Sequence, residues 1–137
     1  MSVFSDIRTA LESQIASVTG IPSAANRSWE NVRFEPTTGT PWVRMTLLPG
    51  ESRPAIRGEN PVLSYLGLFQ VDVFEPSGGG PRTADTLADA IRDQFSSGTD
   101  ITVNTTTTRI RWSERLPGRL DPPWYMVPIQ ISWYTYV

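Results

Sequence analysis

Three aspartates recur at four-residue spacing in the sequence, at Asp85, Asp89 and Asp93. In a helix this spacing places the three carboxylates on one face, where they could hold a divalent cation or act as general acid and base. A solvated helix face produces the same pattern, with Arg82 and Arg92 three residues away as ion-pair partners. Because no further ligands follow at fixed spacing, the solvated face is favoured, and neither a metal site nor catalytic residues are predicted.

The composition removes most other routes to catalysis. The chain of 137 residues contains no histidine and no cysteine, and all twelve of its positive charges are arginine. Without cysteine there are no disulfides or thiolate nucleophiles. Without histidine the commonest general base and metal ligand is missing, and without lysine there is no Schiff-base chemistry. We therefore predict that the protein is not an enzyme and uses no cofactor.

A glycine-rich stretch, Ser77–Gly80, leads into a predicted helix. Such a stretch could bind phosphate, because a helix N-terminus attracts anions. The phosphate-binding loop motif, however, requires a lysine and then Ser or Thr after its last glycine, whereas Pro81 and Arg82 follow here. The stretch is predicted to be a flexible joint between a strand and a helix.

Four of the twelve arginines fall within eleven residues, at Arg109, Arg111, Arg115 and Arg119. Trp112 and Trp124 lie beside them, and cationic groups interleaved with aromatic rings can bind single-stranded nucleic acid. The alternative is an edge strand that its charges protect against unwanted pairing and that forms salt bridges between subunits. The net charge of −2 favours this alternative, since phosphate binding depends on local cations. The four arginines and Trp124 are therefore candidate interface residues.

The hydrophobic pattern predicts the elements that position these groups. Apolar residues at three- and four-residue steps predict an amphipathic helix over 3–18, with Asp6 on its polar side. A second helix follows the glycine-rich stretch, and its apolar stripe runs from Ala84 to Phe95.

Alternating residues predict strands over 40–48 and 62–75. The mixed-charge segment between them, 51–61, is long for a connection inside a small domain. It predicts an arm, at about residues 50–61, that orders on contact with a partner; a disordered hairpin tip is the alternative. The candidate contact residues on this arm are Arg53, Arg57 and Glu59.

The last third of the chain reads as strands. Residues 109–114 alternate so that Ile110 and Trp112 share one face against arginines. In the closing strand, 124–137, Tyr134 and Tyr136 share the face opposite the apolar residues.

These elements predict one α+β domain over residues 1–137. Its sheet is mixed or antiparallel, with two helices packed on one face and a long β-hairpin arm. The uncovered face carries Tyr134, Tyr136 and Trp42, and so much aromatic surface suggests a partner or another copy of the chain. No segment approaches the roughly 20 apolar residues of a membrane span, so no membrane contact is predicted.

Several segments carry a family resemblance, namely Pro41–Arg44, Leu47–Glu51, Gly67–Phe74 and Ala84–Ile91. Together with the short N-terminal helix and the aromatic closing strand, they resemble the tail terminator-like proteins of long-tailed, siphovirus-type bacteriophages. The resemblance extends over roughly residues 3–137, with matching element order.

The resemblance implies a structural protein of the virion, in its tail or neck, that is assembled in the host cytoplasm. Six copies would form a ring that caps the tail tube, stops its polymerisation and provides the surface on which the head docks. The implied partners are further copies of the chain, the major tail tube protein and the head–tail connector or stopper protein. DNA would pass through the lumen without specific binding. The resemblance carries no catalytic, cofactor or metal residue.

A closed ring requires two different contact surfaces on each subunit. The aromatic uncovered face and the arginine-rich strand are expected to supply one each. The alternative within phage assembly is another neck component, such as a head-completion protein, a head–tail connector or a minor tail protein.

Overall fold

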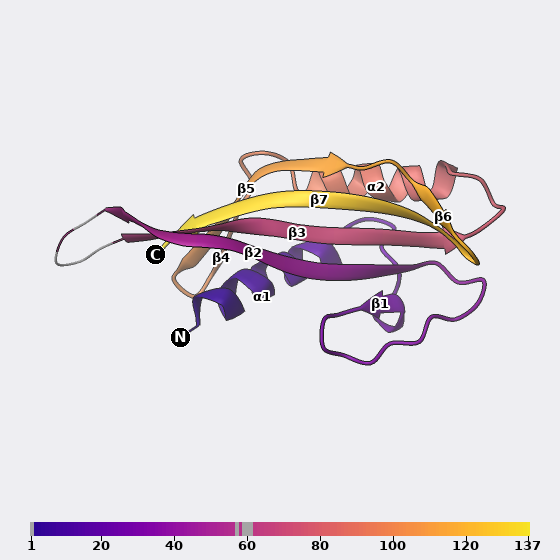
Figure 1. Ribbon diagram of the computed structural model, residues 1–137, viewed down its shortest axis with the longest axis horizontal. Helices are drawn as coiled ribbons and strands as arrows, with labels where there is room; N and C mark the ends of the chain where they lie inside the picture. Colours follow the sequence, from indigo (N-terminus) through magenta and orange to yellow (C-terminus); the bar gives the residue numbers. More distant parts are fainter. Residues whose placement is uncertain (1, 57, 59–61) are drawn as a thin grey trace.

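The computed structural model describes residues 2–56, 58 and 62–137 (Figure 1). The helices are α1 (Val3–Ala16) and α2 (Arg82–Gln94), and a 3-10 turn, η1 (Ala24–Asn26), precedes the first strand. The strands are β1 (Arg27–Ser28), β2 (Trp42–Ile56), β3 (Val62–Pro76), β4 (Asp100–Val103), β5 (Thr106–Arg115), β6 (Arg119–Asp121) and β7 (Trp124–Tyr136).

The strands form one mixed sheet in the order β1-β2-β3-β7-β5-β4, with β6 paired to β7 off this path. All neighbouring strands are antiparallel except β1, which runs parallel to β2. The central pair, β3 and β7, stays in register from Ser64 opposite Tyr136 to Pro76 opposite Trp124. The α+β class and the mixed sheet predicted from the sequence are confirmed.

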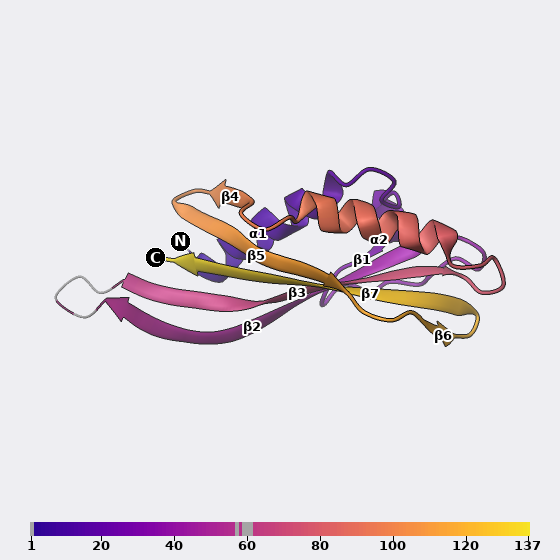
Figure 2. The same ribbon diagram turned by 90° about the horizontal axis from the view of Figure 1, so that it is seen from above.

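Both helices lie on the same face of the sheet, as predicted (Figure 2). Their apolar stripes pack against the side chains that the central strands direct to this face. The fully buried core includes Ile7, Leu11, Ile15, Ile91, Phe95, Phe69, Val71, Ile129, Ile131 and Trp133. We call the sheet face away from the helices the open face.

Local sequence signals account for the helix ends. The Ser5 backbone N–H donates to the Ser2 hydroxyl oxygen at 3.2 Å, and this hydrogen bond caps α1. Pro81 directly precedes α2, where its missing N–H costs no hydrogen bond.

Asp6 is the exception to the predicted polar side of α1. Its side chain is buried, with 5% of its surface exposed. The carboxylate accepts hydrogen bonds from Asn104 Nδ2 at 2.8 Å and from Thr106 Oγ1 at 3.0 Å. The expectation of a solvated Asp6 is wrong because the β4–β5 hairpin, about 100 residues further along the chain, packs against this part of the helix.

The β2–β3 hairpin contains more strand and less loop than predicted. Residues 51–56, expected in a loop, continue β2, and the pairing tolerates irregularities at Pro49/Ser52 and Pro54/Ile56. Because β7 ends opposite the first residues of β3, the end of the hairpin projects beyond the sheet (Figure 1). We call residues 51–56 and 62–64 the hairpin arm.

A β-bulge in β5 changes which side chains share a face. Ile110 pairs with Trp133, whereas Trp112 pairs with Ser132, and the register shifts between the two. The bulge therefore moves Trp112 to the open face, and the expectation that Ile110 and Trp112 share a face is wrong. A bulge inserts one extra residue into the strand, so the alternation of side chains breaks at that point.

Trp42 is on the open face but is not exposed. Its ring stacks on Phe74 with centroids 3.9 Å apart, and Phe34 from the preceding loop lies 5.1 Å away. With Trp124 and Met126 these residues form a second buried cluster. The expectation that Trp42 adds to the exposed aromatic surface is wrong, because the loop before β2 covers this end of the face.

Candidate functional site

The open face presents an apolar surface away from the second buried cluster. Four large side chains on it are between 39% and 55% exposed: Leu48, Leu66, Trp112 and Tyr136. Tyr134 lies beside Tyr136 in an edge-to-face contact, with ring centroids 5.8 Å apart. Neighbouring strands β2, β3, β7 and β5 each supply at least one of these residues, so the surface is continuous across the sheet.

A hollow of about 640 Å³ opens on this apolar surface. Leu66, Arg111, Tyr134 and Tyr136 line it, together with residues next to β4. One predicted arginine and both predicted tyrosines therefore meet at one place. A cationic group beside aromatic rings suits a partner that brings a carboxylate or another aromatic side chain.

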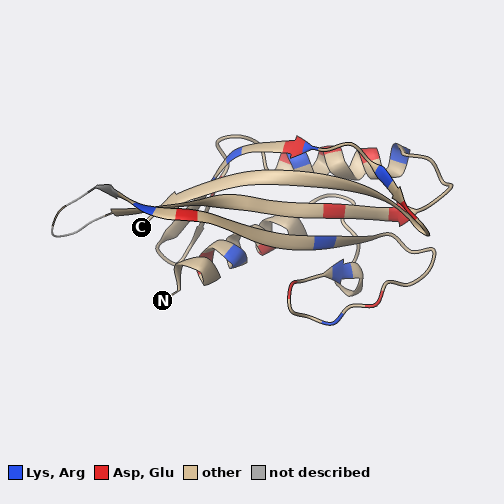
Figure 3. Cartoon of the chain, viewed as in Figure 1, with Lys and Arg blue, Asp and Glu red and all other residues tan. Residues whose placement is uncertain are grey.

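The other clustered arginines do not join this hollow. Arg109 forms an ion pair with Asp100 at 2.8 Å. The β5 bulge turns Arg115 to the helix face, where its guanidinium meets the Asp85 carboxylate at 2.8 Å. Arg119 lies on the exposed strand β6. The structure thus distributes the four arginines over different surfaces, and charges of both signs are interspersed over the molecule (Figure 3).

An ion pair that the sequence pattern did not single out lies on the open face between β2 and β3. Arg44 donates to Asp72 through Nε at 3.1 Å and through a terminal nitrogen at 3.0 Å, and Gln70 donates to the second carboxylate oxygen at 2.9 Å. The Arg44 guanidinium also lies 5.1 Å from the Phe74 ring centroid. The sequence places Arg44 and Asp72 in the two predicted strands, each on the face opposite the buried residues. Only the strand register shows that they lie opposite each other.

The regular row of aspartates has no metal-site geometry. Asp85 is the partner of Arg115, while Asp89, Arg92 and Asp93 line another surface hollow. Among the residues that the structure describes, no group of three or more acidic or other metal-ligating side chains is placed to hold an ion.

The hairpin arm carries one of the predicted contact residues. Arg53 is exposed and forms an ion pair with Glu51 on the same strand. The other two predicted residues, Arg57 and Glu59, lie outside the described part of the chain. Trp124, predicted at an interface, is only 8% exposed because it belongs to the second buried cluster.

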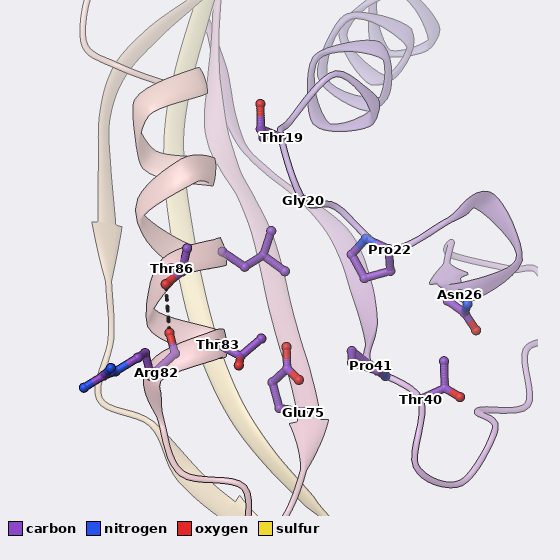
Figure 4. Close-up of a pocket in the computed structure, with 11 residues that line it drawn as sticks. Thr19, Gly20, Pro22, Asn26, Thr40, Pro41, Glu75, Arg82, Thr83 and Thr86 are labelled. Atoms are coloured by element: carbon purple, nitrogen blue, oxygen red, sulfur yellow. Dashed lines mark hydrogen bonds between the residues drawn. The ribbon is translucent and has the colours of Figure 1, made fainter.

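A pocket of about 600 Å³ lies at the end of the molecule opposite the hairpin arm, beside the start of α2. Its wall includes Pro22, Pro41, Thr83 and Leu87, and the carboxylate of Glu75 points into it (Figure 4). Glu75 has 7% of its surface exposed, and burial raises the pKa of its carboxyl group. Sequence reasoning missed this residue, because one acidic residue near the end of a strand carries no distinguishing pattern.

A family model for the phage tail terminator protein matches residues 6–133. The chain belongs to this phage tail terminator family. The family is a structural one, so this tail terminator has a structural role in tail assembly and is a component of the virion. No helix in the described chain is long and apolar enough to span a membrane.

Solved structures share the fold of this tail terminator. One that bears no descriptive name is 24% identical, with a TM-score of 0.71 over 96% of this chain and 93% of the other. A chain from the virion of a native gene transfer agent particle is 15% identical, with a TM-score of 0.60 over 99% of this chain and 98% of the other. A search of curated proteins finds no significant match.

Proposed function

We propose that this tail terminator assembles into a ring, of six subunits, that caps the tail tube, stops its polymerisation and provides the surface on which the head docks. The observation that carries the proposal is the family match over residues 6–133. The partners are further copies of the chain, the major tail tube protein and the head–tail connector or stopper protein.

The open face supports self-assembly. A monomeric protein gains nothing by leaving Leu66, Trp112 and Tyr136 in water, and a contiguous apolar surface is typical of an interaction site. Burying such side chains contributes about 25 cal/mol per Å² of apolar area. We assign the hollow formed by Arg111, Tyr134 and Tyr136 to the contact between subunits or between the ring and the tube.

A ring also needs a second, different surface, because its contacts are heterologous. The exposed strand β6, which bears Arg119, is suited to this role. Arginine forms planar, bidentate contacts with carboxylates, which makes it well adapted to salt bridges between subunits. The net charge of −2 also suits a ring through which DNA passes without being held.

Native mass spectrometry and negative-stain imaging test the proposal. We expect rings, either in the free protein or after mixing with tail tubes, and we expect them at one end of each tube. The protein should also be present on tails made without heads. A protein that stays monomeric at high concentration in the presence of tubes, or that is found on heads made without tails, contradicts the proposal.

A further inference from the structure

The buried carboxylate of Glu75 has no partner among the residues that the structure describes. Glu75 lies on the helix side of β3 and points into the pocket beside α2 (Figure 4). Within the described chain neither a hydrogen bond nor an ion pair reaches its side chain, and burial alone shifts its pKa upward. A buried carboxylate is costly unless a cation or a donor accompanies it, so a positively charged group that entered the pocket would stabilise Glu75.

The pocket has the shape and lining for a long cationic side chain. Pro22, Pro41 and Leu87 offer apolar surface for an aliphatic stem, and Glu75 offers the charge for its head. Arg82 lines the pocket with its stem, but its guanidinium is directed to the far side of α2 (Figure 4). An arginine entering from outside would complete the site with charge-assisted hydrogen bonds.

The hairpin arm presents one arginine and lacks support of its own. Between Ser64 and the tip of the hairpin, the two strands pair with each other but no longer with β7. The exception is Leu63, which exchanges backbone hydrogen bonds with Val137. An isolated two-stranded hairpin is marginally stable in water, so a docking partner would stabilise it. The arm presents Arg53, whose side chain is 74% exposed and is paired only with the similarly exposed Glu51 on its own strand. An exposed ion pair contributes little, so Arg53 can exchange Glu51 for a buried carboxylate.

The arm and the pocket cannot meet within one molecule. Arg53 pairs with Ser64 at the start of β3, and Glu75 lies eleven residues further along the same strand. At about 3.3 Å per residue in a strand, the two sites are on the order of 36 Å apart. The start and the end of β3 lie at opposite ends of the molecule (Figure 1).

We propose that the hairpin arm of one subunit docks at the Glu75 pocket of the next, with Arg53 entering the pocket and pairing with Glu75. The contact joins opposite ends of two copies and is therefore heterologous, the type that closes rings. The inference rests on the proposed ring, and it assigns the two halves of one subunit contact.

Because the chain contains no cysteine, engineered cysteines report on this contact cleanly. The test mixes a Ser52→Cys protein, which keeps Arg53, with a Thr83→Cys protein under the conditions in which the wild type assembles, and oxidises the mixture. We expect a disulfide-linked dimer of the two variants. The matched control replaces Thr83→Cys by Ser13→Cys, an exposed position on α1, and should give no dimer with Ser52→Cys.

A second experiment identifies the segment that occupies the pocket. A photoreactive benzophenone is attached to Cys at position 83 (T83C), and the assembled sample is irradiated in the presence of tail tubes. A cross-linked peptide from the hairpin arm of another copy supports the proposal. A cross-linked peptide from the tube protein, or from any other segment of this chain, overturns it.

Charge variants test the pairing itself. We expect Glu75→Gln and Arg53→Gln each to weaken ring assembly about tenfold or more, and Arg53→Lys to weaken it less, because truncating one member of a buried charge pair is costly. Glu75→Gln should leave the unfolding temperature equal or higher, which excludes misfolding as the cause. If Glu75→Gln forms rings at the same protein concentration as the wild type, and the cysteine variants form no disulfide-linked dimer, the docking proposal is overturned and the proposed ring stands. A wild-type protein that never forms rings overturns both.

Discussion

At the scale of single residues, two buried carboxylates have opposite surroundings. Asp6 accepts hydrogen bonds from Asn104 and Thr106 and joins α1 to the β4–β5 hairpin. Glu75 has no such donor among the described residues and faces a pocket. A satisfied buried carboxylate stabilises a fold, whereas an unsatisfied one costs stability. The first carboxylate therefore has a role in the fold, and the second is available for a partner.

Replacing Asp6 tests its structural role. We expect Asp6→Ala to lower the free energy of unfolding by about 2–3 kcal/mol, because it leaves the buried Thr106 hydroxyl without its acceptor. Urea unfolding measures the loss. The control is Asp89→Ala on the exposed side of α2, which should change stability little. Equal effects of the two substitutions would contradict the buried role of Asp6.

The pH dependence of stability tests the state of Glu75. Burial raises the pKa of this carboxyl group above its ordinary value of 4.5. Its contribution to stability is therefore fully present below pH 4.5 and is lost as the pH rises through the folded-state pKa. Arg82, the neighbouring cation, directs its charge away from the pocket (Figure 4).

Glu75→Gln removes this titration. In urea unfolding of the monomer, the variant and the wild type should have similar stability near pH 4, and the variant should become the more stable as the pH approaches 7. A constant difference across this range would show that Glu75 ionises without penalty.

At the scale of elements, the close packing of β2, β3 and β7 depends on a residue without a side chain. A Cβ atom added to Gly67 would lie 2.6 Å from the Leu48 carbonyl oxygen and 2.7 Å from the Trp133 ring. The Trp133 side chain is fully buried against the helices, so it cannot move away cheaply. The place of Trp133 in the core thus requires a glycine on the neighbouring strand.

We expect Gly67→Ala to destabilise the fold by about 2–3 kcal/mol through overpacking. Thermal or urea unfolding measures the effect, and Gly79→Ala is the matched control, because an added Cβ there meets nothing closer than 3.8 Å. Destabilisation by the control alone would contradict the proposed close approach.

At the scale of the whole molecule, the two faces of the sheet have different roles. The helix face is closed by α1 and α2, whereas the described segments cover the open face only at the end where Phe34 and Trp42 pack. The rest of the open face presents Leu66, Trp112 and Tyr136. The uneven covering is consistent with a subunit that completes its burial on assembly.

Tyr136→Glu tests the open face. Tyr136 is 55% exposed, so the free energy of unfolding of the monomer should change by no more than about 0.5 kcal/mol. Ring assembly, followed by native mass spectrometry across a concentration series, should weaken about tenfold or more, because a charge enters an apolar contact. Val32→Glu, at an equally exposed residue away from this face, should assemble as the wild type does. Wild-type assembly of Tyr136→Glu would exclude the open face as an interface.

Much of the fold could be predicted from local sequence patterns. Periodicity reveals the stripe from Ile7 to Ile15 and the alternation in β3 and β7, because these patterns depend on residues close together in the chain. The helices, the central strands and their shared core follow from these signals.

Only the tertiary structure decided which surfaces these elements create. The β5 bulge separates Trp112 from Ile110 and turns Arg115 to the helix face, while distant segments bury Asp6 and Trp42. The Glu75 pocket is formed by segments near residues 20, 41 and 83, as well as by β3. Periodicity reports the direction of a side chain within its own element, whereas burial and partnership depend on what long-range pairing brings against it. The sequence by itself therefore determined the elements and their apolar faces, and the register and packing of those elements decided the contact surfaces.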